Sequence, residues 1–174
     1  MATSSDQRLG PDDGSLFVRT YREGVAAKVG HDLVLEVTRW EAALAPETIQ
    51  FTADARSLEV REGLRGVKPL TDKDRAEIGK NIDEKVLRGA PIGFRSSRVE
   101  RSGGRLTVQG DLTIAGSTRP VIAQLNVDGD GRITGRIPLT QSAWGIKPYR
   151  GLMGALRVRD EIAVEIDVRA PGEL

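Results

Sequence analysis

The chain has 174 residues, with 26 Lys and Arg against 25 Asp and Glu, one histidine and no cysteine. This length suits a single domain that can bury a core without disulfide bonds. The absence of cysteine excludes disulfides, thiolate metal sites and thiol catalysis, and a single histidine excludes a multi-histidine metal centre, so we expect no metal and no cofactor. A formal net charge of +1 argues against nucleic acid as the main partner.

The N-terminal stretch, residues 1–13, is polar and predicts a flexible segment ahead of a single domain over residues 14–170. It has neither the basic nor the apolar region of a secretory signal, so a cytoplasmic location is expected. No apolar run approaches the length that spans a bilayer, which argues against stable membrane insertion.

Alternating apolar residues in the first third of the domain predict a β-meander. One of its strands is apolar on both faces, with Leu33, Leu35 and Val37 on one side and Val34 and Trp40 on the other. If the first side is buried, the second forms an exposed apolar patch on the outer face.

One helix is predicted over residues 72–88. Thr71 with Asp74 resembles a capping box, and Gly89 follows the last periodic residue. Its apolar residues recur at every fourth position and form a single stripe: Ile78, Ile82 and Val86. A helix with one apolar stripe must lie across an apolar surface.

The best-patterned strand pair covers residues 105–127, with a tight turn at residues 115–118. Further alternating stretches follow and extend nearly to the C-terminus. Some eight to ten short strands with one helix predict an all-β fold, either a closed antiparallel β-barrel or a sandwich. A barrel of about eight strands is favoured, because closure removes exposed sheet edges. We expect the helix to pack at or across the barrel. Because the inward positions are mostly mid-sized aliphatic residues, we also expect a cavity.

Four segments in the same order resemble the YceI-like family. They read GVAAKVGHDLVLEV near the N-terminus, GDLTIAGSTRPV at residues 110–121, SAWGI at 142–146 and LRVRDEIAVEIDV at 156–168. The resemblance implies a lipocalin-like β-barrel whose long apolar cavity binds an extended hydrophobic molecule such as a polyisoprenoid or another long-chain lipid. It carries no catalytic set.

The chain departs from the family pattern in three ways, one of which is that no export signal is visible, although many members are periplasmic or secreted. A polar block that often ends in paired phenylalanines is replaced by the predicted helix. The usual Arg and Asp before the aromatic-Gly step are replaced by Gln141 and Ala143, with Trp144 as the aromatic residue. These departures leave the identity of the ligand open.

Two groups of residues are candidate ligand contacts. The first group shares the inward parity of the strands: Phe51, Phe94, Leu106, Val108, Leu112 and Ile114. The second lies in the Gly- and Pro-rich segment 141–155, which with the helix is our candidate for a gate. There Trp144, Tyr149 and Met153 would grip a chain, and Lys147 and Arg150 would meet a phosphate or carboxylate head group. The alternative is that Trp144 plugs one barrel end and the cations are only solvated.

His31 precedes Asp32, but adjacent strand residues point to opposite faces, so the pair does not predict acid–base catalysis. The simplest interpretation is a hydrogen bond that holds a turn, and contact with a ligand head group is the alternative.

These observations lead to the hypothesis of a non-enzymatic carrier for one long-chain hydrophobic small molecule. The alternative is a structural or assembly module with a filled barrel, which would act through an exposed outer face at Val34 and Trp40 and could form a homodimer.

Overall fold

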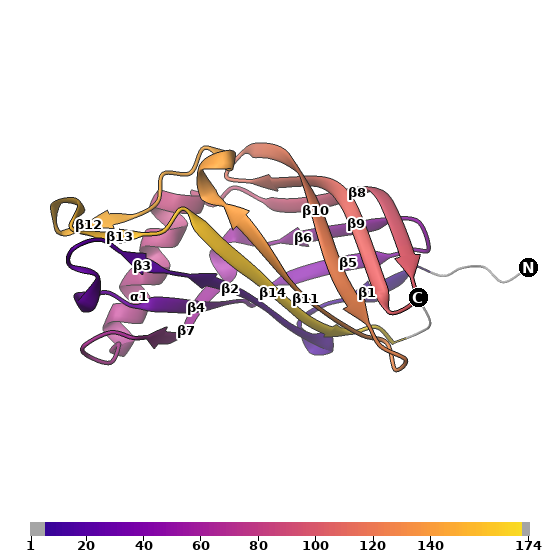
Figure 1. Ribbon diagram of the computed structural model, residues 1–174, viewed down its shortest axis with the longest axis horizontal. Coiled ribbons are helices and arrows are strands. Elements are labelled where there is room, and N and C mark those ends of the chain that lie inside the picture. The colour runs from indigo at the N-terminus through magenta and orange to yellow at the C-terminus, as the bar shows by residue number, and fades with distance from the viewer. Residues whose placement is uncertain (1–5, 172–174) are drawn as a thin grey trace, which may run out of the picture.

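The computed structural model describes residues 6–171 and consists of a strongly curled antiparallel sheet with one helix at its end (Figure 1). In order across the sheet, the strands are β1 (Gln7–Leu9), β5 (Trp40–Leu44), β6 (Ile49–Ala53), β8 (Ile92–Ser102), β9 (Arg105–Ile114), β10 (Ser117–Val127), β11 (Arg132–Thr140), β14 (Glu161–Arg169), β2 (Gly14–Thr20), β4 (Asp32–Val37) and β7 (Leu58–Leu64). The all-β prediction with one helix is confirmed.

The sheet has eleven strands, so the prediction of about eight is not confirmed. One reason is that β4 and β5 follow each other directly and are separated only by Thr38 and Arg39. Opposite this break, a 3-10 turn at Ala55–Ser57 separates β6 from β7. Hydrogen bonds still cross the gap, because the Thr38 amide donates to the Ser57 carbonyl at 2.9 Å. The strand predicted to run from Leu33 past Trp40 is thus divided in two, and β7 is an additional strand.

A further strand comes from the N-terminal stretch, which the sequence predicts to be flexible over residues 1–13. Within the described part of that stretch, β1 pairs with β5, and Leu9 is buried in the core. A single-turn 3-10 helix, Pro11–Asp13, then leads into β2. The prediction is therefore wrong for residues 7–13, while residues 1–5 lie outside the described part.

The predicted hairpin is present as β9 and β10. Ile114 pairs with Ser117 across a two-residue turn in which Ala115 and Gly116 have φ of 49° and 80°. Two successive positive φ values match the right-handed twist of the strands, which explains the tight reversal. Leu106 is buried on the inner face.

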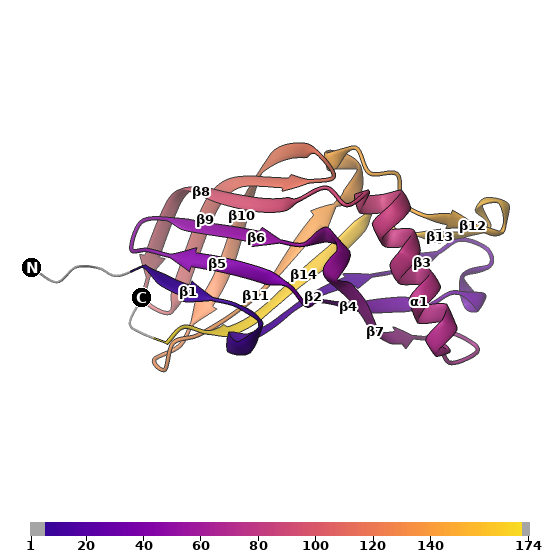
Figure 2. The ribbon, with the colours of Figure 1, turned by 180° about the vertical axis from the view of Figure 1, so that it is seen from behind.

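The helix lies across one end of the curled sheet, as Figure 2 shows. It comprises α1 (Asp72–Asn81) and a π-helical turn at Ile82–Leu87. The predicted capping box is present: the Thr71 hydroxyl accepts from the Asp74 amide at 3.1 Å, and the Asp74 carboxylate accepts from the Thr71 amide at 2.9 Å.

A second, small sheet stands at the same end as the helix (Figure 1). It consists of β12 (Arg150–Gly151), β13 (Leu156–Val158) and β3 (Arg22–Glu23), with β13 in the middle. Strand β1 and the end of β14 approach the opposite end of the molecule. The fold therefore has one end built from the helix, the small sheet and loops, and another end at which β1 begins and β14 ends.

Candidate functional site

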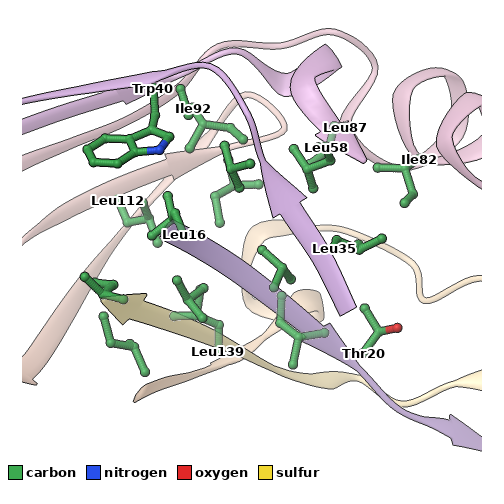
Figure 3. A pocket seen from close by; sticks show the side chains of 18 of the residues that line it. Leu16, Thr20, Leu35, Trp40, Leu58, Ile82, Leu87, Ile92, Leu112 and Leu139 are labelled. Atoms are coloured by element: carbon green, nitrogen blue, oxygen red, sulfur yellow. The ribbon is translucent and has the colours of Figure 1, made fainter. Parts of the chain in front are cut away.

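The inner face of the curled sheet and one face of the helix line a pocket of about 830 Å³. Its wall is mostly aliphatic, and side chains from both halves of the chain point into it (Figure 3). Those labelled in the figure include Leu16, Trp40, Leu58, Ile82, Leu112 and Leu139. Such a volume lies in the upper part of the range of about 300–1,000 Å³ that is usual for small-molecule sites.

All six strand residues proposed as ligand contacts belong to the pocket wall: Phe51, Phe94, Leu106, Val108, Leu112 and Ile114. Phe51 and Phe94 are direct cross-strand partners on β6 and β8. The Trp40 ring packs near Phe51 with its centroid 6.2 Å away. Alternation along the strands places these side chains inside, so the structure brings the first predicted group together.

The predicted apolar stripe of the helix, Ile78, Ile82 and Val86, also lines the pocket. The π-helical turn explains a fourth contact, Leu87, which is buried. Since a π turn accommodates one more residue than an α turn, it brings Leu87 onto the same face as Ile82. The helix thus closes part of the pocket with four aliphatic side chains.

Trp144 closes a gap in the sheet. Strands β10 and β11 pair only near Val127, so they diverge toward the helix end. A 3-10 turn, Gln141–Trp144, contacts β10 there. The buried Trp144 indole donates from Nε1 to the Leu112 carbonyl at 2.9 Å, and Arg119 donates to the Ala143 carbonyl at 2.9 Å. Trp144 is therefore a fixed part of the wall.

Polar groups gather where the pocket reaches the loops near the helix. The Asp32 carboxylate is buried, accepts from the Arg22 amide at 2.8 Å and pairs with Arg65. The Arg22 guanidinium donates to the carbonyls of Ala27 and Gly30 at 3.0 and 3.1 Å. These bonds fix the loops, because buried polar groups are stable only when they are hydrogen-bonded.

His31 lines the pocket, and its Nε2 lies 2.5 Å from the Lys68 carbonyl oxygen. The contact ties the turn after β3 to the loop between β7 and α1. The residue thus has the loop-holding hydrogen bond that its place in a turn predicts, and its contact with a ligand stays a prediction.

Only part of the second predicted group of ligand contacts, in segment 141–155, lies at the pocket. Tyr149 lines the pocket together with Trp144, whereas Lys147, Arg150 and Met153 do not belong to its wall and are exposed. Arg150 lies on β12 of the small sheet, Lys147 precedes that strand, and Met153 follows it in a 3-10 turn.

The predicted outer patch of Val34 and Trp40 is wrong, because only 6% and 8% of these residues are exposed. The break at Thr38 and Arg39 shifts the alternation by one residue, so Trp40 points into the pocket instead of outward. Val34 does lie on the outer parity, but it is flanked by its cross-strand partners Arg19 and Glu62. Their long side chains can cover it.

Several lining residues lie outside the two predicted groups of ligand contacts. Leu16, Val18 and Thr20 of β2 line the pocket, and their alternation in the sequence was a usable signal. Arg22 and Arg157 also line it, but no sequence pattern marks them, since their position depends on pairing between β3 and β13.

The carboxylates whose pKa is shifted do not form an acid–base pair in the pocket. Hydrogen bonds from the Thr71 amide lower the pKa of Asp74, which is the shifted carboxylate on the pocket wall. Backbone and arginine hydrogen bonds lower the pKa of Asp54 and Asp167 outside it. These carboxylates are ionised caps and ion-pair partners, a state that suits structure and not proton transfer near neutral pH.

Across residues 6–171, no group of three or more His, Asp or Glu side chains is placed to hold a metal ion. The same residues include no helix with the length and apolar character required to cross a membrane.

Comparisons with known proteins agree with this architecture. A family model described as the YceI-like domain matches residues 18–170, whereas no curated protein sequence gives a match. The fold is similar to BcnA of Burkholderia cenocepacia, with a TM-score of 0.61 and 17% identity over 88% of this chain and 94% of that chain. It is also similar to the Campylobacter jejuni YceI protein, with a TM-score of 0.52 and 11% identity over 99% of this chain and 89% of that chain. The solved structures support the fold, and the family model spans most of the sequence, so the chain belongs to the YceI-like family.

Proposed function

We propose that this protein is a non-enzymatic carrier that holds one long-chain apolar molecule, a polyisoprenoid or another lipid-like compound, inside the curled sheet. The observation that carries the proposal is the pocket of about 830 Å³ with a mostly aliphatic and aromatic wall. Burial of an apolar chain there is favourable by about 25 cal/mol per Å², before the cost of ordering the ligand is subtracted.

The two tryptophans of the chain make this proposal testable. Trp40 and Trp144 are the only tryptophans in the sequence, and both lie in the pocket wall. A fluorescent polyene fatty acid such as cis-parinaric acid should therefore accept energy from both rings when it binds. We expect saturable energy transfer that weakens in Trp40→Phe and in Trp144→Phe.

Two neighbouring residues on β10 provide a matched pair of variants. Ala123 lines the pocket, whereas the side chain of Ile122 is 64% exposed on the other face of the strand. Ala123→Phe places a ring in the pocket and should lower the affinity for the probe at least about tenfold, the effect of 1.4 kcal/mol. Ile122→Phe should bind as the unmodified protein does. Equal affinity in the two variants would contradict binding in the pocket.

The natural ligand can be sought directly. Native mass spectrometry of the protein purified from its own host should show an added mass, and solvent extraction should release a lipid of that mass. The proposal would be contradicted if the spectrum showed only the mass of the protein without a ligand and if no long-chain probe accepted energy from the tryptophans.

A further inference from the structure

Three loops join at the helix end of the molecule and form what we call the mouth rim, residues 22–30, 65–70 and 147–159. The Ala26 amide donates to the Ala155 carbonyl at 2.9 Å, and the Val67 amide donates to the Lys28 carbonyl at 3.3 Å. These two bonds connect all three loops. The rim includes β3, β12 and β13, which Figure 1 shows at the end opposite to β1.

The mouth rim exposes an unusual share of large apolar side chains. Among the side chains that the structure describes, seven large apolar ones are exposed, and five of them belong to the rim: Val25, Val29, Val67, Tyr149 and Met153. Val25 is 97% exposed and Val67 is 71% exposed. A sixth, Leu64, directly precedes the rim, so only Ile122 lies on a different part of the surface. Single exposed apolar residues are normal, but this concentration on one rim requires an explanation.

Positive charge is concentrated on the same rim. Its three segments contain eight Lys and Arg and one Glu, a formal charge of +7. All other residues together contain 18 Lys and Arg and 24 Asp and Glu, a formal charge of −6. The near-neutral net charge of the chain thus hides a strong asymmetry, which orients a protein toward an anionic surface.

Four of these cations are both exposed and without an ion pair in the described part of the chain: Lys28, Lys68, Lys147 and Arg150. Of the other four, Arg65 pairs with Asp32, and Arg157 and Arg159 lie within 4.0 Å of the Glu23 carboxylate. The guanidinium of the half-buried Arg22 donates to backbone carbonyls instead. The neighbouring segment 72–87 is nearly balanced, with four basic and five acidic residues.

Exposed apolar tips interleaved with unpaired cations are typical of proteins that bind at the interface of an anionic bilayer. The apolar side chains enter the headgroup region, and the long cationic side chains reach the phosphates. The pocket extends to this rim, because Val29, Lys68 and Tyr149 belong both to the rim and to the pocket wall and are exposed.

We propose that the mouth rim docks onto an anionic lipid bilayer, with the pocket opening facing the membrane. Docking of this kind is peripheral, and it would let an apolar molecule pass between bilayer and pocket without crossing water. The docking surface is independent of the ligand that the pocket holds.

Vesicle co-sedimentation tests the proposal with the full chain. We expect binding to vesicles of equal parts phosphatidylcholine and phosphatidylglycerol, little binding to phosphatidylcholine alone, and weaker binding as salt is raised. The double variant Lys28→Gln, Lys68→Gln should lose about fivefold in affinity per cation, about 25-fold in total. Arg105→Gln, at the β8–β9 turn on the other end, should bind as the unmodified protein does.

The apolar part of the surface has its own test. The double variant Val67→Ser, Met153→Ser should reduce binding to the mixed vesicles about tenfold or more, while Ile122→Ser should not. Equal vesicle binding by all variants, or equal binding to neutral and anionic vesicles, would overturn the proposal. Energy transfer from Trp40 and Trp144 to a fatty acid in solution is measured separately, so a failure of docking is distinguished from a failure of the carrier function.

Discussion

At the scale of single residues, Gly110 shows why the segment at residues 110–121 begins with a glycine. Gly110 lies on the inner face of β9, where a Cβ would come within 2.3 Å of the Arg95 carbonyl oxygen and 2.5 Å of the Phe94 ring. The ring of Phe94 thus occupies the space that a side chain would need. We infer that the segment requires glycine there so that Phe94 can lie flat against the pocket wall.

Gly110→Ala should therefore destabilise the protein by about 1–3 kcal/mol, because a backbone oxygen cannot move aside as a flexible side chain does. Urea unfolding measures this difference. Gly129→Ala is the matched control, since a Cβ there meets nothing within 4 Å. An equal loss in both variants would contradict the close approach of Phe94.

The ion pair of Asp167 and Arg132 gives a prediction on pH. The Arg132 guanidinium donates two hydrogen bonds, at 2.9 and 2.8 Å, which lower the pKa of Asp167. A carboxyl whose pKa is lower in the folded state stabilises the fold above its unfolded pKa of about 3.9. That contribution is lost as pH falls through the lower, folded pKa.

Asp167→Asn should thus be less stable than the unmodified protein near neutral pH, by less than about 1 kcal/mol because the pair is half exposed. The difference should vanish well below about pH 4. Thermal unfolding of both proteins across this range checks the expectation, and a difference that grows toward acid pH would contradict it.

At the scale of elements, the cap of α1 links stability to the pocket. Thr71 and Asp74 satisfy each other's backbone amides, and the helix they begin covers the pocket with Ile78 and Ile82. Thr71→Ala should cost about 1 kcal/mol of unfolding free energy and lower the affinity for a pocket ligand. Thr71→Ser should retain both properties, because serine also caps. Urea unfolding and probe titration measure them, and unchanged affinity in Thr71→Ala would show that the helix does not help to hold the ligand.

Elements with an uninterrupted period were predictable from the sequence. The inward side of β9 follows from a period of two residues, and the apolar stripe of the helix follows from a period of nearly four residues. Trp40 was not predictable in this way, because a break of two residues reverses the side to which each later residue points. Leu87 is similar, since an α-helical period does not place it beside Ile82, whereas the π turn does.

At the scale of the whole molecule, the helix end depends on contacts between distant parts of the sequence. Hydrogen bonds join its loops: the Val67 amide donates to the Lys28 carbonyl, and the Ala26 amide donates to the Ala155 carbonyl. No local sequence pattern marks such bonds. Composition and inward parity were enough to predict a cavity. They gave no sign of the polar groups where the cavity reaches the loops near the helix. The asymmetry of charge was equally hidden, because it exists only when three separate segments are brought together.

The occupied pocket should also stabilise the whole fold. A ligand that binds only the folded state at 100 times its Kd adds about 2.7 kcal/mol. For a chain of this size, that corresponds to a rise of about 5–10 °C in Tm. We expect delipidated protein to show this rise when cis-parinaric acid is added. Ile122→Phe should respond in the same way, whereas Ala123→Phe, which narrows the pocket and weakens binding about tenfold, should show only about half of that rise. A rise of equal size in Ala123→Phe would place the fatty acid somewhere other than the pocket, because the added ring occupies part of the space that its chain would use.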